Sequence, residues 1–315
     1  METIRIGISA CLLGHPVRYD GETRLDPFLV ETWGRHFEYV PVCPETGMGL
    51  PVPREPSRLE GDPGQPRFVA RQTRTDHTGR LERWGRERLG ALERDDLDGF
   101  VFKSRSPSCG IRELAVYRDE EIISRTGAGV WARMVMERFP LLPVEDERRL
   151  FDPDIRDAFI ERVFVYRRWR VFCAANPTPA GLIEFHARHK LILMAHRPSG
   201  YREMGKLAAQ AGTADREGLF GTYGDMLMDV LKTRATVRKN VNVLDHVMGY
   251  FKRNCPPEEK RELLDAIARY REGELPLIVP VTLLNHYAGK YAQEYLRDQY
   301  YLNPHPLERL LRNHA

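Results

Sequence analysis

The sequence predicts an α/β domain built on a Rossmann-like parallel sheet, followed by an all-α helical domain. Four short apolar or β-branched runs have the composition of buried strands: 4–9, 38–42, 99–103 and, more weakly, 141–144. Segments with a helical period lie between them, at 81–94 and 129–139. This alternation of strands and helices along the chain is typical of a parallel α/β sheet.

The pattern changes after Pro143 and the charged residues 145–149. Beyond this point the sequence has long segments of helical period: 152–175, 180–195, 200–211, 215–253, 257–272 and 280–300. We therefore expect two domains, an α/β domain over residues 1–145 and a helical domain over residues 150–315.

The sequence composition argues against a secreted, membrane-spanning or disulfide-rich protein. The first 23 residues lack an apolar run behind a basic start, and no eighteen consecutive positions are apolar. We therefore expect a cytoplasmic protein without a membrane span. Five cysteines in such a chain favour metal binding or catalysis over a disulfide framework.

One stretch of the first domain does not follow the alternating pattern. Residues 51–80 are rich in Pro, Gly, Arg and Thr and poor in apolar side chains. This composition predicts a long excursion over the surface or over a site.

Three of the cysteines follow predicted strands. Cys11 comes after the first strand, Cys43 after the second, and Cys109 lies six residues beyond the third. The carboxyl ends of parallel strands point into one crevice, so we expect these three thiols to meet there. Cys173 and Cys255 lie in helical segments, and we interpret both as small buried side chains.

Three thiolates without a fourth cysteine nearby suit a cubane iron–sulfur cluster with one open iron, whereas structural zinc usually takes four protein ligands. The alternative for each cysteine is a buried apolar role. Glycines crowd the same three loops, at positions 14, 47, 49 and 110, and would let the backbone approach a bulky group.

The same loops carry a resemblance to a known family. The segments SACLLGHPVRYDG (9–21), PVCPETGMGLPVPR (41–54) and KSRSPSCG (103–110) resemble those of the TudS-type thiouracil desulfidases. The helical remainder is similar to the domain of unknown function fused to these enzymes in the RudS subgroup. Members of that subgroup are implicated in removing sulfur from 4-thiouridine of tRNA.

The resemblance implies a 4Fe-4S cluster on Cys11, Cys43 and Cys109, with one open iron for the substrate's sulfur. The implied reaction replaces C=S by C=O in a thiolated pyrimidine without an external electron donor. Glu45 is the candidate base for water. Ser106 is the first candidate for a catalytic serine and Ser104 the second, while Ser108 is expected to cap the loop backbone.

Polar residues close to the cysteines are candidates for holding the pyrimidine or its phosphate. They are His15, Arg18, Tyr19, Asp20 and Arg54. Each could equally form a surface ion pair or a turn.

Two basic helical stretches indicate that tRNA is the substrate. Residues 162–170 interleave Arg with Tyr and Trp, and residues 232–253 carry six Lys and Arg against one Asp. Such faces can lie along phosphates and stack on bases. His186, His189 and His196 are interpreted as a polar face or as RNA contacts rather than as metal ligands.

Three other functions are consistent with the sequence. The first is a desulfidase of free 2-thiouracil or related thiobases, whose helical domain serves oligomerisation. The second is a non-enzymatic RNA-binding sensor that uses the cluster. The third, a zinc hydrolase or deaminase, lacks the expected H-x-E and P-C-x-x-C pattern. The sequence does not determine the oligomeric state.

Overall fold

Four parallel strands form the central sheet of the first part of the chain. The computed structural model describes residues 3–175, 177–212, 216–252 and 255–313. The sheet has the order β2-β1-β5-β8. Its strands are β1 (Ile4–Ser9), β2 (Phe37–Val42), β5 (Gly99–Phe102) and β8 (Val144–Asp146). The predicted α/β fold class is confirmed, although the fourth strand lies at 144–146 rather than at 141–144.

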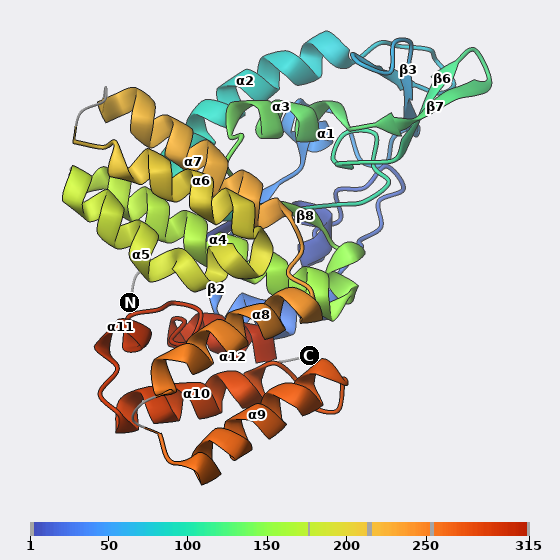
Figure 1. Cartoon of the computed structure of the whole chain (residues 1–315). Coiled ribbons are helices and arrows are strands. Elements are labelled where there is room, and N and C mark those ends of the chain that lie inside the picture. Colours follow the sequence, from blue (N-terminus) through green and yellow to red (C-terminus); the bar gives the residue numbers. More distant parts are fainter. Residues whose placement is uncertain (1–2, 176, 213–215, 253–254, 314–315) are drawn as a thin grey trace. The chain divides into compact units, whose positions relative to one another are not determined.

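Two helices pack on one face of this sheet through apolar side chains. Alternate residues of β5, Phe100 and Phe102, stack at 4.1 Å and join the same core cluster as Trp131. That core also contains the apolar sides of α2 (Thr78–Asp95) and α3 (Val130–Arg138), which pack together. Figure 1 shows these two helices side by side.

The other face of the sheet is covered by aromatic and branched side chains. Trp33 is fully buried and stacks on Phe159 of α4 (Pro153–Ala174) at 6.0 Å. A Cβ added at Gly99 would lie within 3.3 Å of Val163 and Phe159, so α4 approaches the sheet closely there. The first part of the chain is therefore a three-layer α/β/α arrangement.

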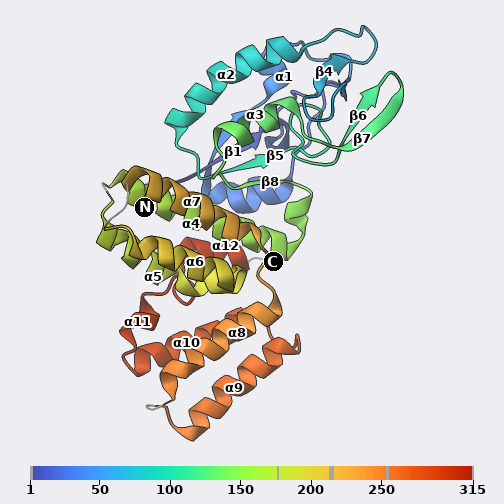
Figure 2. The same cartoon turned by 45° about the horizontal axis from the view of Figure 1, so that its top comes forward.

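A second sheet is formed by the stretch 51–80 together with residues 114–127, and the sequence predicts strands in neither. It has the order β4-β3-β6-β7 and is visible in Figure 2. Its strands are β3 (Ser57–Glu60), β4 (Arg67–Ala70), β6 (Leu114–Arg118) and β7 (Glu121–Gly127). The stretch 51–80, which we expect to pass over the surface or over a site, contains two four-residue strands that the sequence does not predict. They are too short to show a clear apolar alternation.

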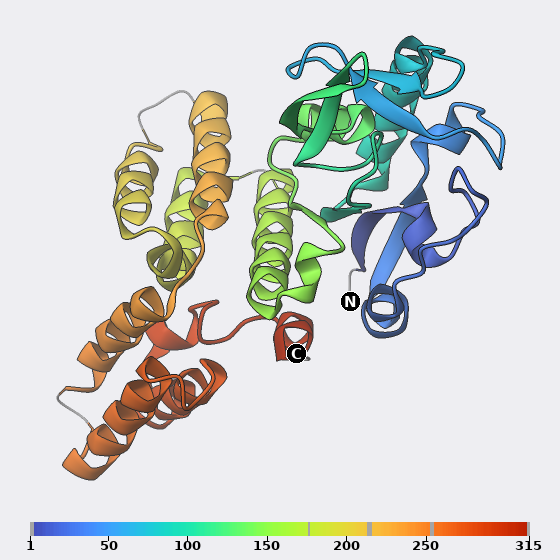
Figure 3. The ribbon, with the colours of Figure 1, turned by 90° about the vertical axis from the view of Figure 1, so that its right-hand side faces the viewer.

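The chain divides into two compact units, Met1–Arg167 and Arg168–His314. The predicted domain edges at 145 and 150 stay predictions. The second unit is helical, as predicted, and Figure 3 shows its helices in yellow to red. After α4 they are α5 (Pro179–His196), α6 (Pro198–Ala209), α7 (Arg216–Lys232), α8 (Val237–Met248), α9 (Pro257–Arg271), α10 (Ile278–Lys290), α11 (Glu294–Arg297) and α12 (Pro306–Asn313). The first unit also has a short α1 (Pro44–Gly47).

The single helix predicted over 215–253 is two helices. The chain leaves the helical conformation after Lys232 and starts α8 at Val237. The hydroxyl of Thr236 accepts a hydrogen bond from the backbone N–H of Lys239, which is a helix N-cap. No Pro or Gly lies between Lys232 and Val237 to mark this break in the sequence. No described helix is long and apolar enough to cross a membrane.

The three predicted surface histidines are buried. His189 and His196 are at most 1% exposed, and Nδ1 of His186 lies 3.0 Å from the Tyr223 hydroxyl. Their interpretation as RNA contacts is therefore wrong. Burial lowers the pKa of His186 to about 4, so its imidazole stays neutral in the folded chain.

The helical unit should lose stability in acid through His186. Because the unfolded pKa is near 6.5 and the folded pKa is lower, the loss grows as the pH falls from about 6.5 to about 4. Between pH 7.5 and 5 we expect His186 to contribute a loss on the order of 1 to 2 kcal/mol. Urea unfolding followed at 222 nm should show a shallower acid slope for His186→Gln. Parallel slopes for the two proteins would contradict the assignment.

Candidate functional site

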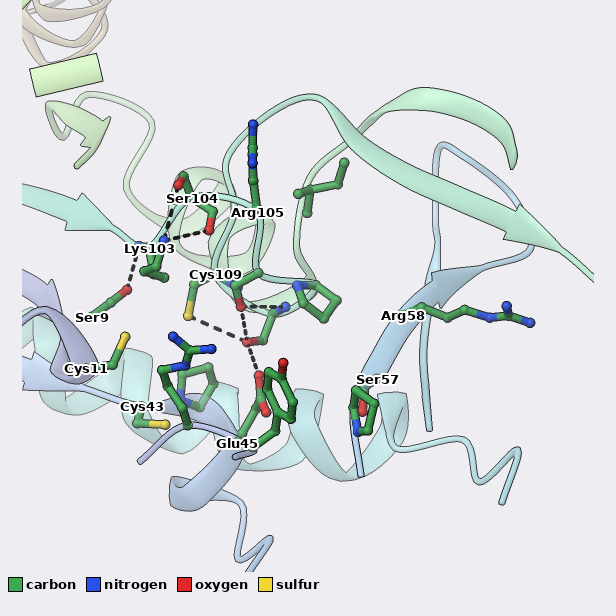
Figure 4. A pocket seen from close by; sticks show the side chains of 18 of the residues that line it. Ser9, Cys11, Cys43, Glu45, Ser57, Arg58, Lys103, Ser104, Arg105 and Cys109 are labelled. Carbon is green, nitrogen blue, oxygen red and sulfur yellow. Dashed lines mark hydrogen bonds between the residues drawn. The ribbon is translucent and has the colours of Figure 1, made fainter. Parts of the chain in front are cut away.

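A pocket of about 630 Å³ opens at the carboxyl ends of β1, β2 and β5. These are three adjacent strands of the parallel sheet, so the loops that follow them share one edge. Residues of β3 and β6 line the pocket as well. The second sheet therefore forms a wall of the pocket (Figure 4).

The three cysteines that follow the strands all line this pocket. Cys11 lies in a short 3-10 helix directly after β1, and Cys43 immediately precedes α1. Cys109 lies in the loop between β5 and β6. All three are free thiols, and Cys11 and Cys109 are less than 10% exposed. Cys173 and Cys255 do not line the pocket.

Residues at the start of α3 form hydrogen bonds to the loop that carries Cys109. The backbone N–H of Gly129 donates to the carbonyl of Gly110 at 2.7 Å, and that of Ala132 donates to the carbonyl of Ser108 at 3.2 Å. A Cβ at position 129 would lie 2.4 Å from the Ser108 carbonyl oxygen. Glycine is therefore the residue that lets α3 approach this loop.

Two of these thiols, Cys11 and Cys109, are difficult to ionise in the protein alone. Burial, followed by the charge of Cys43, raises the pKa of Cys11 to about 11. Burial and the charges of Cys43 and Cys11 likewise raise the pKa of Cys109. The three sulfurs are close enough to oppose one another's charge, so a group with several positive centres would stabilise the thiolates.

The donor set of this pocket fits an iron–sulfur cluster. Three thiols reach it from three different loops, and in such a cluster each thiolate binds a different iron. Zinc also takes thiolate ligands, but its structural sites usually have four protein ligands.

Glu45 is held at the pocket by an arginine. Nε and Nη2 of Arg54 lie 2.8 and 2.6 Å from Oε2 of Glu45, and Nη2 also donates to the carbonyl of Val17. Both side chains are at most 15% exposed. A charge-assisted contact of this kind fixes the carboxylate in position. Its other oxygen, Oε1, accepts a hydrogen bond from Ser108 at 2.7 Å.

The serines of the KSRSPSCG segment have different partners. Ser108 Oγ lies between Glu45 and the sulfur of Cys109, at 2.7 and 3.6 Å. Ser106 Oγ lies 3.0 Å from Ser108 Oγ and accepts from the backbone N–H of Cys109. Of the two, Ser106 is thus the one that caps the loop, and Ser108 is the one that contacts Glu45. The catalytic role of either serine stays a prediction.

Ser104 belongs to a separate group with Lys103 and Glu147. Ser104 donates to Glu147 through its backbone N–H at 2.6 Å and its hydroxyl at 2.7 Å, and Lys103 Nζ also pairs with Glu147. The backbone N–H of Lys103 donates to Ser9 Oγ at 2.9 Å. Figure 4 shows Lys103 near Cys11. These bonds tie the end of β5 to β1 and to the segment after β8.

The predicted substrate-binding residues separate into two groups. Arg18, Tyr19 and Arg54 line the pocket, whereas His15 and Asp20 do not. Asp20 instead accepts from Arg18 at 2.8 Å and so orients it.

Several arginines that line the pocket are not among the residues predicted from the sequence. Arg105 lies inside the KSRSPSCG segment, so its position was available from sequence. Arg58 and Arg71 lie in the stretch 51–80, and Arg148 lies among the charged residues 145–149. Residues far apart in the chain reach the pocket through the second sheet, which the sequence did not predict.

One predicted RNA-binding face is absent. In 162–170, Arg167 pairs with the fully buried Asp98 at 2.8 Å, and Arg168 pairs with the fully buried Glu308. Arg162 is buried beside Glu145, and Trp169 is 4% exposed. The interleaved basic and aromatic pattern of this segment therefore reflects packing and ion pairs.

Comparison with known proteins assigns the two parts of the chain to different families. Residues 6–147 match the model of the 2-thiouracil desulfurase family, and this range contains all three pocket cysteines. This part of the chain is a 2-thiouracil desulfurase domain. Downstream of this desulfurase domain, residues 190–306 match DUF1722, a family described as a protein of unknown function.

Two individual proteins are also similar. One is a solved structure, the 4Fe-4S-dependent thiouracil desulfidase TudS, which is 30% identical and aligns over 48% of this chain and 95% of its own, with a TM-score of 0.38. The other is the uncharacterized protein YbgA of Escherichia coli (strain K12). It is 29% identical over 151 residues, which are 48% of this chain and 89% of that protein.

Gly129→Ala should disturb the desulfurase domain at the Cys109 loop. The added methyl group would overlap the backbone of Ser108, and overpacking of this kind costs about 1 to 3 kcal/mol. Thermal unfolding should show a lower midpoint, and iron bound after reconstitution should fall.

Gly90→Ala is the matched control, since a Cβ at this α2 position meets nothing within 4 Å. The control should gain up to about 1 kcal/mol. Equal behaviour of the two variants would contradict the packing argument.

Proposed function

We propose that this protein is a desulfidase that replaces the sulfur of a thiolated pyrimidine by oxygen, and that its substrate is 4-thiouridine in tRNA. The family of the first domain supports the reaction. The charge of the pocket supports the substrate. The helical domain would hold the rest of the RNA.

Cys11, Cys43 and Cys109 would hold a 4Fe-4S cluster, the group on which the similar thiouracil desulfidase TudS depends. With three protein ligands one iron stays open, and the cluster supplies a soft Lewis acid for the thione sulfur. The chain's own residues then have to place the pyrimidine, supply a proton acceptor for water and exclude competing reactions.

Glu45 is the proton acceptor in this proposal. Arg54 holds Oε2, which leaves Oε1 as the atom that takes the proton of the attacking water. Ser108 donates to Oε1 and lies 3.0 Å from Ser106 Oγ. Once Oε1 is protonated, Ser108 would turn, accept this proton and pass its own through Ser106 to the departing sulfur, so that C=S and water give C=O and hydrogen sulfide. Ser106 would contact the substrate ring, while Ser104 with Glu147 would fix the adjoining backbone.

The observation that carries the choice of substrate is the excess of positive charge around the pocket. Among its described lining residues are seven arginines and one lysine, against a single carboxylate, Glu45. Arg71, Arg105 and Arg148 have no ion-pair partner within the described residues. A free thiobase carries no charge that needs three such cations, whereas a phosphodiester chain does.

The substrate is tested with reconstituted protein under anaerobic conditions. Loss of thione absorbance is followed for 4-thiouridine tRNA, for the free nucleoside and for free 2-thiouracil. We expect the highest kcat/KM with tRNA. Arg71→Gln with Arg105→Gln should lower kcat/KM for tRNA about tenfold more than for 2-thiouracil, because only the RNA has phosphates to lose contact with.

The matched control is Arg83→Gln with Arg86→Gln, which removes two charges from the exposed side of α2. This pair should leave the ratio between the two substrates unchanged. A preference of the wild-type protein for the free base would contradict the tRNA assignment. If cluster-loaded protein turns over none of the three substrates, the alternative of a non-enzymatic RNA-binding sensor is favoured.

A further inference from the structure

Lys103 and Glu147 form an ion pair beside the pocket that contains the three cysteines. Lys103 directly follows β5 and lines the pocket, whereas Glu147 directly follows β8 and is not a lining residue. Their side chains are 22% and 8% exposed. The positive member of the pair therefore faces the pocket, and the negative member lies behind it.

The ammonium group of Lys103 is fully used by contacts within the protein. Nζ donates to the carbonyl and the hydroxyl of Ser104, at 3.1 and 3.3 Å, and to Oε1 of Glu147. An ammonium group has three N–H donors, and these three acceptors take all of them. Lys103 therefore acts as a fixed positive charge and not as a hydrogen-bond donor to a substrate.

Backbone hydrogen bonds fix the ion pair relative to Cys11. The backbone N–H of Lys103 donates to Oγ of Ser9, which precedes Cys11 by two residues, at 2.9 Å. Oε2 of Glu147 accepts from the backbone N–H of Ser104 at 2.6 Å. The backbone N–H of Glu147 donates to the carbonyl of the last residue of β5 at 3.3 Å. These bonds hold the pair at the ends of β1, β5 and β8.

The positive charge of Lys103 acts on the sulfur of Cys11. Figure 4 shows the two side chains near each other. Burial and the charge of Cys43 raise the pKa of the Cys11 thiol, and the charge of Lys103 lowers it. Glu147 raises this pKa, but its effect is smaller than that of Lys103. Arg18 acts in the same direction as Lys103 and more weakly. Of the ion pair, Lys103 thus dominates the field at this sulfur.

We infer that Lys103, positioned by Glu147, supplies the fixed charge that sets the reduction potential of the cluster on the side of Cys11. The inference rests on the proposed function, because it requires the cluster. The potential of an iron–sulfur cluster depends on the charges and hydrogen bonds that surround it. A cation fixed beside a ligand favours the reduced form, which carries one more negative charge.

The same charge bears on the proposed reaction. When Glu45 takes a proton from water, its negative charge passes through the substrate to the departing sulfur. The sulfur holds this charge, with the electron pair of the broken C–S bond, until its proton arrives. A fixed cation stabilises the charge without giving up a proton of its own. Lys103 thus acts through the field at the site and not by contact with the reacting atoms.

The test is a redox titration of the reconstituted full-length protein without substrate, in which electron paramagnetic resonance measures the reduced cluster. At a fixed ambient potential, Lys103→Gln should lower the ratio of reduced to oxidised cluster about tenfold, which is about 59 mV for one electron. Glu147→Gln should raise this ratio by a smaller factor, because it removes the opposing negative charge. A merely structural disturbance would not give shifts of opposite sign.

Two control variants keep the charge at the site. Lys103→Arg retains the cation, and Arg83→Gln removes one charge from the exposed side of α2, where solvent screens it. Both should keep the wild-type ratio to within about twofold. If Lys103→Gln does not retain the cluster, Lys103→Met replaces it, since methionine keeps the apolar part of the side chain without the charge.

The outcome is separable from the test of catalysis. Equal ratios for the wild type, Lys103→Gln and Glu147→Gln, or shifts of the same sign, would overturn this inference even where the wild type desulfurates its substrate. The expected opposite shifts in a protein that turns over no thiolated pyrimidine would support the inference and contradict the desulfidase. A wild-type protein that takes up no cluster would contradict both.

Discussion

The parallel pairing of β2, β1 and β5 is the constraint on which the candidate site depends. In register, Ser9 of β1 lies opposite Val42 of β2, and Ile8 lies opposite Val101 of β5. Three chain segments that are far apart in sequence therefore end at one edge of the sheet. Each continues into a loop that carries one cysteine. Antiparallel pairing of the same strands would send one of these loops to the opposite edge.

The loops beyond the strands are fixed by contacts that leave the sulfurs facing the pocket. Glycine at 129 lets α3 approach the Cys109 loop, while Glu147 binds the backbone and hydroxyl of Ser104. Arg54 positions Glu45 between the cysteines and the second sheet. Ion pairs and hydrogen bonds to the backbone thus hold the polar groups of the site in position. Such preorganisation is what proton transfer to a defined atom requires.

The sequence predicts the parts of this molecule that depend on local chemistry and on strand order. Cys11, Cys43 and Cys109 could be placed at one crevice because each follows an apolar run, and the structure puts all three in one pocket. The wall formed by β3 and β6 could not be predicted, since its four- and five-residue strands pair with segments about sixty residues away. The arginines of 162–170 have the spacing of an exposed helical face. Their ion-pair partners Asp98 and Glu308 are distant in sequence and can be identified only from the structure.

The most direct measurement is the iron and acid-labile sulfide content of five single cysteine variants after anaerobic reconstitution. We expect about four irons and four sulfides per chain for the wild type, for Cys173→Ala and for Cys255→Ala. Cys11→Ala, Cys43→Ala and Cys109→Ala should lose most of that content, because these three thiols line one pocket. Full content in any of the last three variants, or a single metal ion in the wild type, would contradict the assignment of the cluster to these cysteines.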